Sequence, residues 1–276
     1  MTSANPSLIQ AGQLNRNNNN TPLILFHDGG GTTISYHYLG NLGRPVYGIE
    51  DPRFFLGRPW RGGLREMARV YANLVQSIVP SGNVLLGGWS LGGFTALEVS
   101  KVLETDHVDV HVLGIVMLDS PYPGHGPVHQ KAMEGMLRIV PCKPFLQDSC
   151  APELRMLVER SMKRAHRLVE KWIVPEWTDK QHAPPVILLR CQDYVPPRQG
   201  WDDGDSIDAQ ATIVSVDRWR KQRMLGWEHH HNDLVRGVLD VPGHHFNVIL
   251  GENLKATTRQ MKLACEMLEL SFFKRV

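Results

Sequence analysis

Short segments that are apolar throughout alternate along this chain with segments whose apolar residues recur at helical spacing. The apolar segments are the stronger constraint, because a strand that is hydrophobic on both faces must be covered on both faces. A mostly parallel sheet between two layers of helices meets that condition. The sequence therefore predicts the α/β class, with a mostly parallel central sheet and helices on both of its faces.

The same alternation locates the expected elements. Short apolar runs predict buried strands at 23–27, 45–51, 84–86, 110–118 and 186–189, and a last strand is predicted at 235–241. Helical spacing of apolar residues predicts helices at 64–79, 94–103 and 254–270.

The stretch 122–183 interrupts this alternation. It contains helical segments such as 152–172 and no convincing strand. Long insertions in compact domains are typical of functional loops, so we expect a helical lid over the carboxyl edge of the sheet. Residues 1–20 are polar and are expected to form a flexible leader, which leaves residues 21–276 as one domain.

Composition excludes several classes of protein. Hydrophobic residues make up 42% of the chain, which is too much for a disordered protein, and the net charge of +2 is too small for a typical nucleic-acid binder. No apolar run reaches the ~18 residues of a transmembrane helix, and the N-terminus lacks the features of a signal peptide. The four cysteines show no C-x-x-C spacing, so we expect free thiols and a cytoplasmic location.

The segment GWSLG at residues 88–92 fits the pattern G-x-S-x-G. It stands between an expected strand and an expected helix, which is the context that a nucleophilic serine requires. A serine on such a turn has a strained backbone, and neighbouring chains approach so closely that small residues are needed two positions away on either side. Gly88 and Gly92 meet this need, so Ser90 is the candidate nucleophile. The alternative is a glycine-rich turn with an incidental serine.

A nucleophilic serine needs a base, and the base needs an orienting acid. His245 follows the last expected strand, where a fold with this serine motif places its catalytic histidine, and His244 is its close rival. Two acids fit, Asp119 and Asp193, because each ends a strand at the edge where open α/β sheets bind ligands. Spacing alone leaves the choice of acid open.

A glycine-rich segment, FHDGGGT, follows the first clear strand. In α/β-hydrolases a loop at this position supplies one amide of the oxyanion hole, and the residue after the nucleophile supplies the other. The candidate donors are therefore Leu91 together with Asp28, Gly29 or Gly30. A phosphate-binding loop is the alternative, and the absence of both G-x-G-x-x-G and the P-loop lysine argues against it.

Three stretches resemble the thioesterases found at the ends of polyketide synthases and nonribosomal peptide synthetases. They are LILFHDGGGTTISYHYLG, then LLGGWSLGGFTALEVS with GIVMLDSPYP, and finally VPGHHFNVI. The resemblance covers about residues 21–270 and is closest to thioesterase domains of fungal polyketide synthases. It implies the α/β-hydrolase fold with a lid insertion at about 122–183.

The resemblance also implies roles for single residues. The aspartate of that family follows the strand after the nucleophile helix, which corresponds to Asp119 in LDSPYP. The histidine precedes the phenylalanine of VPGxHF, which selects His245 over His244. Asp193 is the alternative acid, as in stand-alone type II thioesterases.

The implied activity is that of a serine thioesterase in fungal secondary metabolism. It would release a polyketide-type acyl chain from an acyl carrier protein by hydrolysis, cyclisation or transfer, as a free-standing enzyme or an excised domain. No metal or organic cofactor is expected. In the lid, Trp172 and Trp177 would line an acyl channel or pack within the lid. The alternatives are a carboxylesterase on small oxygen esters without a carrier, and a binding module that has lost catalysis.

Overall fold

The computed structural model describes residues 4–12, 21–106, 109–124, 138–140, 151–177, 183–196, 212–230 and 233–273. The strands are β1 (Ser7–Ala11), β2 (Leu23–Phe26), β3 (Pro45–Ile49), β4 (Gly82–Trp89), β5 (Val110–Leu118), β6 (Arg138–Val140), β7 (Val186–Cys191), β8 (Thr212–Val214) and β9 (Val235–Val241). The helices are α1 (Gly63–Ile78), α2 (Leu91–Asp106), α4 (Pro152–Glu170) and α5 (Asn253–Phe273), with short 3-10 turns η1 (Ile34–Tyr38), η3 (Ser215–Asp217) and η4 (Trp227–His229).

Seven strands form one sheet in the order β1-β3-β2-β4-β5-β7-β9. Every neighbouring pair is parallel except β1 with β3, which is antiparallel. The prediction of a mostly parallel sheet is therefore confirmed. Because the inner strands run the same way, the loops that follow them meet at one edge of the sheet.

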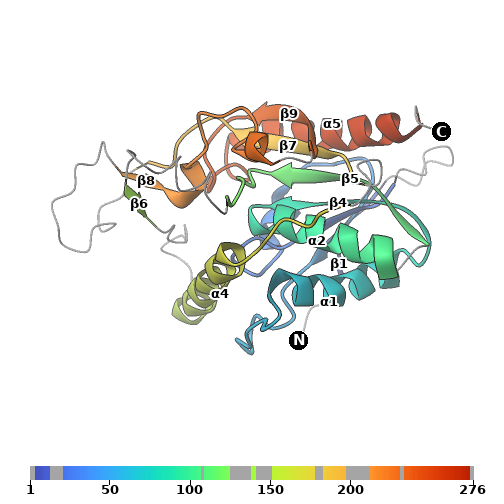
Figure 1. Cartoon of the computed structure of the whole chain (residues 1–276), viewed down its shortest axis with the longest axis horizontal. Helices are drawn as coiled ribbons and strands as arrows, with labels where there is room; N and C mark the ends of the chain where they lie inside the picture. The colour runs from blue at the N-terminus through green and yellow to red at the C-terminus, as the bar shows by residue number, and fades with distance from the viewer. Residues whose placement is uncertain are drawn as a thin grey trace.

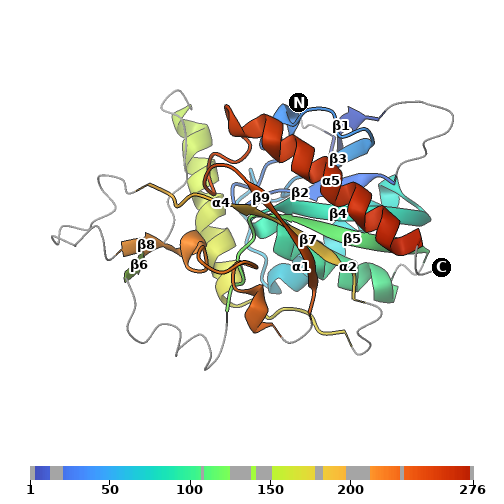
Figure 2. The same cartoon turned by 90° about the horizontal axis from the view of Figure 1, so that it is seen from above.

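Helices cover both faces of the sheet, as Figure 1 shows, with α1 and α2 on one side and α5 on the other. Seen from above, α5 lies across the strands (Figure 2). Burial explains this arrangement, because all four residues of β2 are buried and leave neither face for water. A strand of this kind is stable only between two layers.

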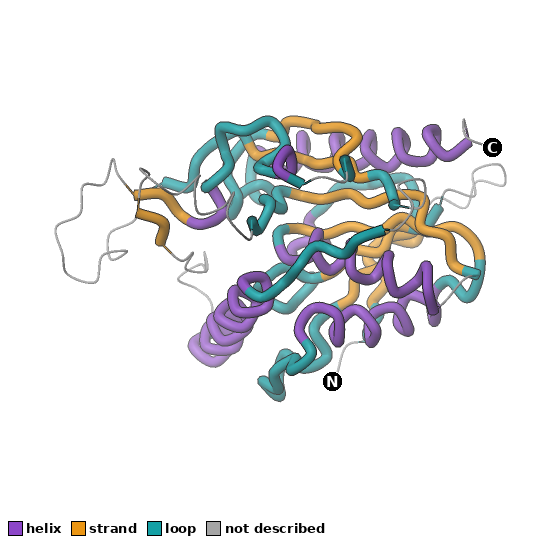
Figure 3. The backbone as a smooth tube through the Cα atoms, in the orientation of Figure 1, coloured by secondary structure: helices purple, strands orange, loops and turns teal. Residues whose placement is uncertain are grey.

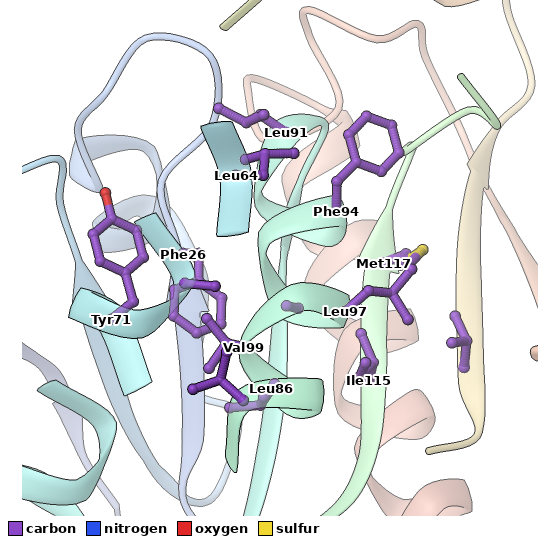
Figure 4. Packing of buried hydrophobic residues seen from close by; sticks show 14 of the residues in the cluster. Phe26, Leu64, Tyr71, Leu86, Leu91, Phe94, Leu97, Val99, Ile115 and Met117 are labelled. Carbon is purple, nitrogen blue, oxygen red and sulfur yellow. The ribbon is translucent and has the colours of Figure 1, made fainter. Parts of the chain in front are cut away.

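A dense core joins α1 and α2 to the sheet (Figure 4). In it, Phe26 of β2 stacks on Tyr71 of α1, with the ring centres 5.8 Å apart. Leu86 of β4 and Leu97 of α2 are both fully buried in the same cluster. Burying such side chains contributes about 1.5–3 kcal/mol each relative to exposing them. This packing fixes the position of α2, whose first turn follows Ser90.

The N-terminal segment departs from the sequence prediction. Residues 7–11, expected within a flexible leader at 1–20, form β1 and pair with β3. The side-chain amide of Asn5 extends this pairing, since it bonds both the N–H and the C=O of Glu50. Main-chain bonds to an edge strand need no apolar pattern, so polarity does not rule them out. Residues 1–3 and 13–20 lie outside the described part of the chain.

The insertion at 122–183 also differs from its prediction. It contains the expected helix, α4, but it also contributes β6, which pairs in parallel with β8 in a small separate sheet. The expectation of no strand there is wrong, because a three-residue strand is too short to show a period. Figure 3 shows α4 and this small sheet at one end of the molecule, beyond the carboxyl ends of the central strands. Much of the rest of the insertion is not described.

Two further properties follow from the described residues alone. None of their helices is both long and apolar enough to cross a bilayer. Cys191 and Cys265 are free and buried, whereas Cys142 and Cys150 lie outside the described residues.

Candidate active site

Ser90 occupies a strained turn between β4 and α2. Its φ is 56°, in the left-handed region that residues other than glycine avoid. Backbone hydrogen bonds hold it there, since Ser90 N–H donates to Leu118 C=O at 2.9 Å and Ser90 C=O accepts from Gly93 N–H at 3.1 Å. Strain of this kind costs about 1–3 kcal/mol and is typical of functional sites.

The glycines around Ser90 are required by space. A Cβ on Gly88 would lie 2.7 Å from the Cα of Gly92 and 2.8 Å from the carbonyl oxygen of Phe26. A Cβ on Gly92 would collide with that same oxygen, and one on Gly93 would collide with the side chain of Ser120. The first turn of α2 therefore packs directly against the end of β2, with no room for a side chain.

The turn brings Ser90 to two distant residues. The Oγ of Ser90 lies 3.1 Å from Nε2 of His245, and Nδ1 of His245 lies 2.8 Å from Oδ2 of Asp119. Trp89 and Phe246 flank the imidazole, with ring centres 5.7 and 4.9 Å away. His245 and Asp119 are 2% and 0% exposed, so the bonds between them are shielded from water. With its proton on Nδ1, the imidazole leaves Nε2 free to accept the proton of the serine hydroxyl.

Asp119 is held from several sides. Its own backbone is left-handed, with a φ of 46°, and its N–H donates to Leu189 C=O. Its Oδ1 accepts the N–H of Cys191 at 2.9 Å, and both carboxylate oxygens accept from the guanidinium of Arg220. Burial opposes ionisation, but the hydrogen bonds and charge of Arg220 outweigh it and hold the pKa of Asp119 well below its usual range.

The rival residues have other partners. The Oδ2 of Asp193 accepts the N–H of Gly243 at 3.1 Å, and Asp193 N–H donates to Gly243 C=O at 2.9 Å. Asp193 thus binds the backbone turn that precedes the two histidines. Nδ1 of His244 accepts the N–H of Phe246 at 3.2 Å. The described contacts place His245 and Asp119, and not these rivals, in line with the serine.

The loop after β2 lies beside the serine. One of the expected oxyanion-hole donors is already engaged within this loop, because Gly30 N–H donates to Oδ1 of Asp28 at 2.7 Å. No other described residue accepts a hydrogen bond from the amides of Leu91, Asp28 or Gly29, so these three remain available. Burial raises the pKa of the Asp28 carboxyl, although the Gly30 N–H and His245 oppose this. Burial thereby disfavours a negative charge on this loop.

Helix α4 packs onto this loop. A Cβ on Gly29 would lie 2.7 Å from the sulfur of Met162, and one on Gly31 would lie 2.6 Å from the hydroxyl oxygen of Ser161. Gly31 also needs its freedom of backbone, since its φ is 87°. Because Gly29 and Gly31 have no side chains, α4 contacts the backbone of the loop after β2 directly.

The segment after α4 is fastened to α2 by Trp172. Its ring lies 5.0 Å from that of Phe94, and its Nε1 donates to Oε1 of Glu98 at 2.7 Å. Trp177 is also buried, and Lys101 lies over its ring. Both tryptophans thus pack between the insertion and α2 rather than within the lid alone, and their place in an acyl channel stays a prediction.

Three residues of the site carry no sequence motif that identifies them. The hydroxyl of Tyr36 donates to Phe26 C=O at 2.7 Å and accepts Trp89 N–H at 2.8 Å, so it ties the ends of β2 and β4. Arg220 and Asp217 lie in a charged segment, SVDRWRKQR, that reads as solvated loop. The tertiary structure shows that Arg220 and Asp217 are both buried, which the sequence does not indicate.

Comparison with known proteins places the chain in a family. A sequence model of the thioesterase domain matches residues 21–262 of the chain. The chain belongs to the thioesterase family. Thioesterase frbD of Dothideomycetidae sp. is 38% identical over 252 residues, which is 90% of each chain. Nonribosomal peptide synthetase imqB of Aspergillus flavus is 29% identical over 302 residues, covering 98% of this chain and 8% of that protein.

Solved thioesterase structures have the same fold. The NocB thioesterase domain from the nocardicin cluster is 26% identical, with a TM-score of 0.62, and the match covers 89% of this chain and 93% of that one. A second structure of that domain is its covalent complex with a fluorophosphonate nocardicin G analog, with a TM-score of 0.59. The predicted family and the predicted α/β-hydrolase fold are confirmed, and the protein is an enzyme of the thioesterase type.

Proposed function

We propose that this thioesterase releases an acyl chain from a carrier-protein thioester through an acyl-serine intermediate on Ser90. The observation that carries the proposal is the line from Ser90 Oγ through His245 to Asp119, with distances of 3.1 and 2.8 Å. Hydrogen-bonded contact among a hydroxyl, an imidazole and a buried carboxylate is the arrangement that activates a serine nucleophile.

Each residue then has one step in the reaction. Ser90 Oγ attacks the thioester carbonyl while Nε2 of His245 takes the hydroxyl proton, and Asp119 stabilises the resulting imidazolium. The amides of Leu91 and of Asp28 or Gly29 donate to the tetrahedral oxygen. His245 returns the proton to the departing sulfur, which leaves an acyl-serine and a free thiol. Water or a substrate hydroxyl then attacks the acyl-serine, with the same imidazole as base.

The proposed donor of the acyl chain is the phosphopantetheine arm of a carrier protein. The similarity to a segment of a nonribosomal peptide synthetase supports this, because such synthetases hold their intermediates as carrier thioesters. A polyketide-type chain is the proposed cargo, as the sequence resemblance implies. We extend the expected catalytic domain of residues 21–276 to include β1, which pairs with β3 in the same sheet. The insertion at about 122–183 is its proposed lid, since α4 packs on the loop beside Ser90.

Intact-protein mass spectrometry tests the proposal. The wild-type protein is incubated with polyketide and peptidyl thioesters on a phosphopantetheinylated carrier and, separately, with a fluorophosphonate. We expect an acyl adduct and a phosphonate adduct on Ser90. In Ser90→Ala both adducts should disappear, and turnover should fall by on the order of 10³-fold or more while the fold is retained.

Simple oxygen esters provide the comparison. Faster turnover of small oxygen esters than of carrier thioesters would favour the carboxylesterase alternative. Wild-type turnover by Ser90→Ala would show that the nucleophile is another residue, and absence of any adduct on the wild-type protein would favour a binding module.

A further inference from the structure

A second ion pair lies directly behind Asp119. Arg220 and Asp217 follow β8, and their side chains are each only 1% exposed. Nη1 and Nη2 of Arg220 donate to Oδ1 and Oδ2 of Asp119 at 2.5 and 2.7 Å. Nε and Nη2 also donate to Oδ1 of Asp217, at 3.0 and 2.9 Å. One guanidinium thus joins two buried carboxylates.

The guanidinium is fully used in this arrangement. Its remaining Nη1 proton goes to the carbonyl of Cys191 at 3.0 Å, so all five N–H donors have an acceptor. The two parallel bonds to Asp119 fix the plane of that carboxylate, and hence the direction of the oxygen that meets His245. A lysine offers one point of charge and cannot fix that plane.

The charges explain why Asp217 is present. Arg220 alone would neutralise Asp119 and weaken its attraction for the imidazolium that forms when His245 accepts the serine proton. Asp217, whose Oδ2 accepts Val195 N–H at 2.7 Å, returns the buried group to a net charge of −1. The imidazolium then faces a net negative group, and this attraction is strong because water is excluded.

We infer that Arg220 and Asp217 are positioning residues for the proposed relay: Arg220 orients and keeps ionised the carboxylate of Asp119, and Asp217 offsets the charge of Arg220. The inference rests on the proposed role of Ser90, His245 and Asp119. It makes the segment after β8 part of the active site, although neither residue touches the serine.

Other titratable groups face this cluster. The thiol of Cys191 and the phenol of Tyr194 approach from the end of β7, and burial raises the pKa of both. Asp28 faces His245 from the loop after β2. The thiol and the phenol are therefore uncharged near neutral pH. Asp119, Arg220 and Asp217 carry the charges of the cluster behind His245, and burial disfavours the charged form of Asp28.

The test is the pH profile of kcat/KM for thioester cleavage. In Arg220→Met the pKa of Asp119 rises and the remaining charge is more negative, so the acid limb should move to higher pH by about 1–3 units. In Asp217→Asn the cluster becomes neutral and binds the proton on His245 less well, so the acid limb should move to lower pH, by up to about 1 unit. Opposite shifts are not expected from a merely structural role.

The double variant separates charge from geometry. Arg220→Met with Asp217→Asn restores the net charge of −1, so its acid limb should return close to that of the wild type. The carboxylate is still unoriented, and kcat/KM should stay about 10²-fold low. Arg220→Lys should keep the wild-type acid limb and recover only part of the rate. Arg223→Met is the matched control, because Arg223 is an exposed arginine on the same segment that pairs with Asp240.

The outcomes are distinguishable from those of the proposed function. If Ser90→Ala is inactive but the acid limbs of Arg220→Met and Asp217→Asn coincide with that of the wild type, the inference is wrong and the relay stands. Shifts in the same direction would also overturn it. If Arg220→Met does not fold, the nearly isosteric Asp217→Asn alone still decides, since it must shift the limb to lower pH.

Discussion

Strain at two single residues aligns the proposed relay. Ser90 and Asp119 both have left-handed backbones, with φ values of 56° and 46°. Each directly follows a parallel strand, and each of their N–H groups donates to a carbonyl of the neighbouring strand. The sheet thus turns both side chains out of its carboxyl edge, at the cost of about 1–3 kcal/mol for each strained residue.

The first prediction concerns the acid. Asp119→Asn should lower kcat by on the order of 10⁴-fold, because an amide no longer fixes the tautomer of His245. Asp193→Asn should change kcat by less than about tenfold, since Asp193 bonds only the backbone of Gly243 among the described residues. Steady-state kinetics on one carrier thioester measures both variants. A larger loss in Asp193→Asn than in Asp119→Asn would contradict the assignment.

A second prediction separates the steric effect of a new Cβ from the effect of restricting a glycine's backbone. Gly92→Ala should lower kcat by about 10²-fold, because the new Cβ meets the carbonyl oxygen of Phe26 and displaces the turn at Ser90. Gly63→Ala is the control, since Gly63 has a φ of 70° but open space around it. Its effect should be limited to about 1 kcal/mol of stability, with kcat unchanged. Equal kcat values in the two variants would count against the steric argument.

At the scale of elements, the contact between the insertion and α2 depends on a buried acid. Glu98 is 7% exposed and accepts a hydrogen bond from Nε1 of Trp172. Burial raises the pKa of Glu98, while Trp172, Arg65 and Arg69 lower it less. The folded state therefore favours the protonated form of Glu98 relative to the unfolded chain, and it loses stability as pH rises through the pKa of Glu98.

The third prediction follows from that sign. Glu98→Gln keeps an acceptor for Trp172 and removes the buried charge, so its Tm should exceed that of the wild type at pH 7. This difference in Tm should vanish at about pH 4, where Glu98 is protonated in both the folded and the unfolded chain. Thermal unfolding at the two pH values measures this, with Glu159→Gln on the exposed face of α4 as control. A lower Tm for Glu98→Gln at pH 7 would refute the argument.

The elements also show what the sequence can and cannot predict. The bounds of β5 and β9 agree with their predicted ranges, 110–118 and 235–241. In β5 an apolar run marks both ends of a buried strand, whereas β9 includes Arg236 and Asp240 and is only partly buried. The short strands β6 and β8 leave no such mark. Motifs also locate Ser90, since its turn requires particular neighbours. Arg220 belongs to no local motif. Asp217 is three residues away, but Cys191 and Asp119 are 29 and 101 residues away, so only the tertiary structure reveals its role.

At the scale of the whole molecule, a buried ion pair joins the amino-end edge of the sheet to α5. Arg44, which precedes β3, donates to both carboxylate oxygens of Glu269 in α5, at 2.7 and 3.1 Å. The side chains are 1% and 16% exposed. Arg44 lies at the amino end of a parallel strand, whereas the proposed relay lies at the carboxyl ends. The two sites are therefore separated by the length of the sheet.

The last prediction uses this separation. Glu269→Ala should lower the free energy of unfolding by about 3–5 kcal/mol, because it leaves the guanidinium of Arg44 buried and unpaired. The double variant Arg44→Met with Glu269→Leu should recover most of that loss, since apolar side chains need no partner there. Urea denaturation measures stability, and kcat of the folded variants should equal that of the wild type. Arg223→Met is the control, because its pair with Asp240 is partly exposed and should contribute less than about 1 kcal/mol. A double variant no more stable than Glu269→Ala would show that the site needs its charges, and a fall in kcat would show that the two edges of the sheet are coupled.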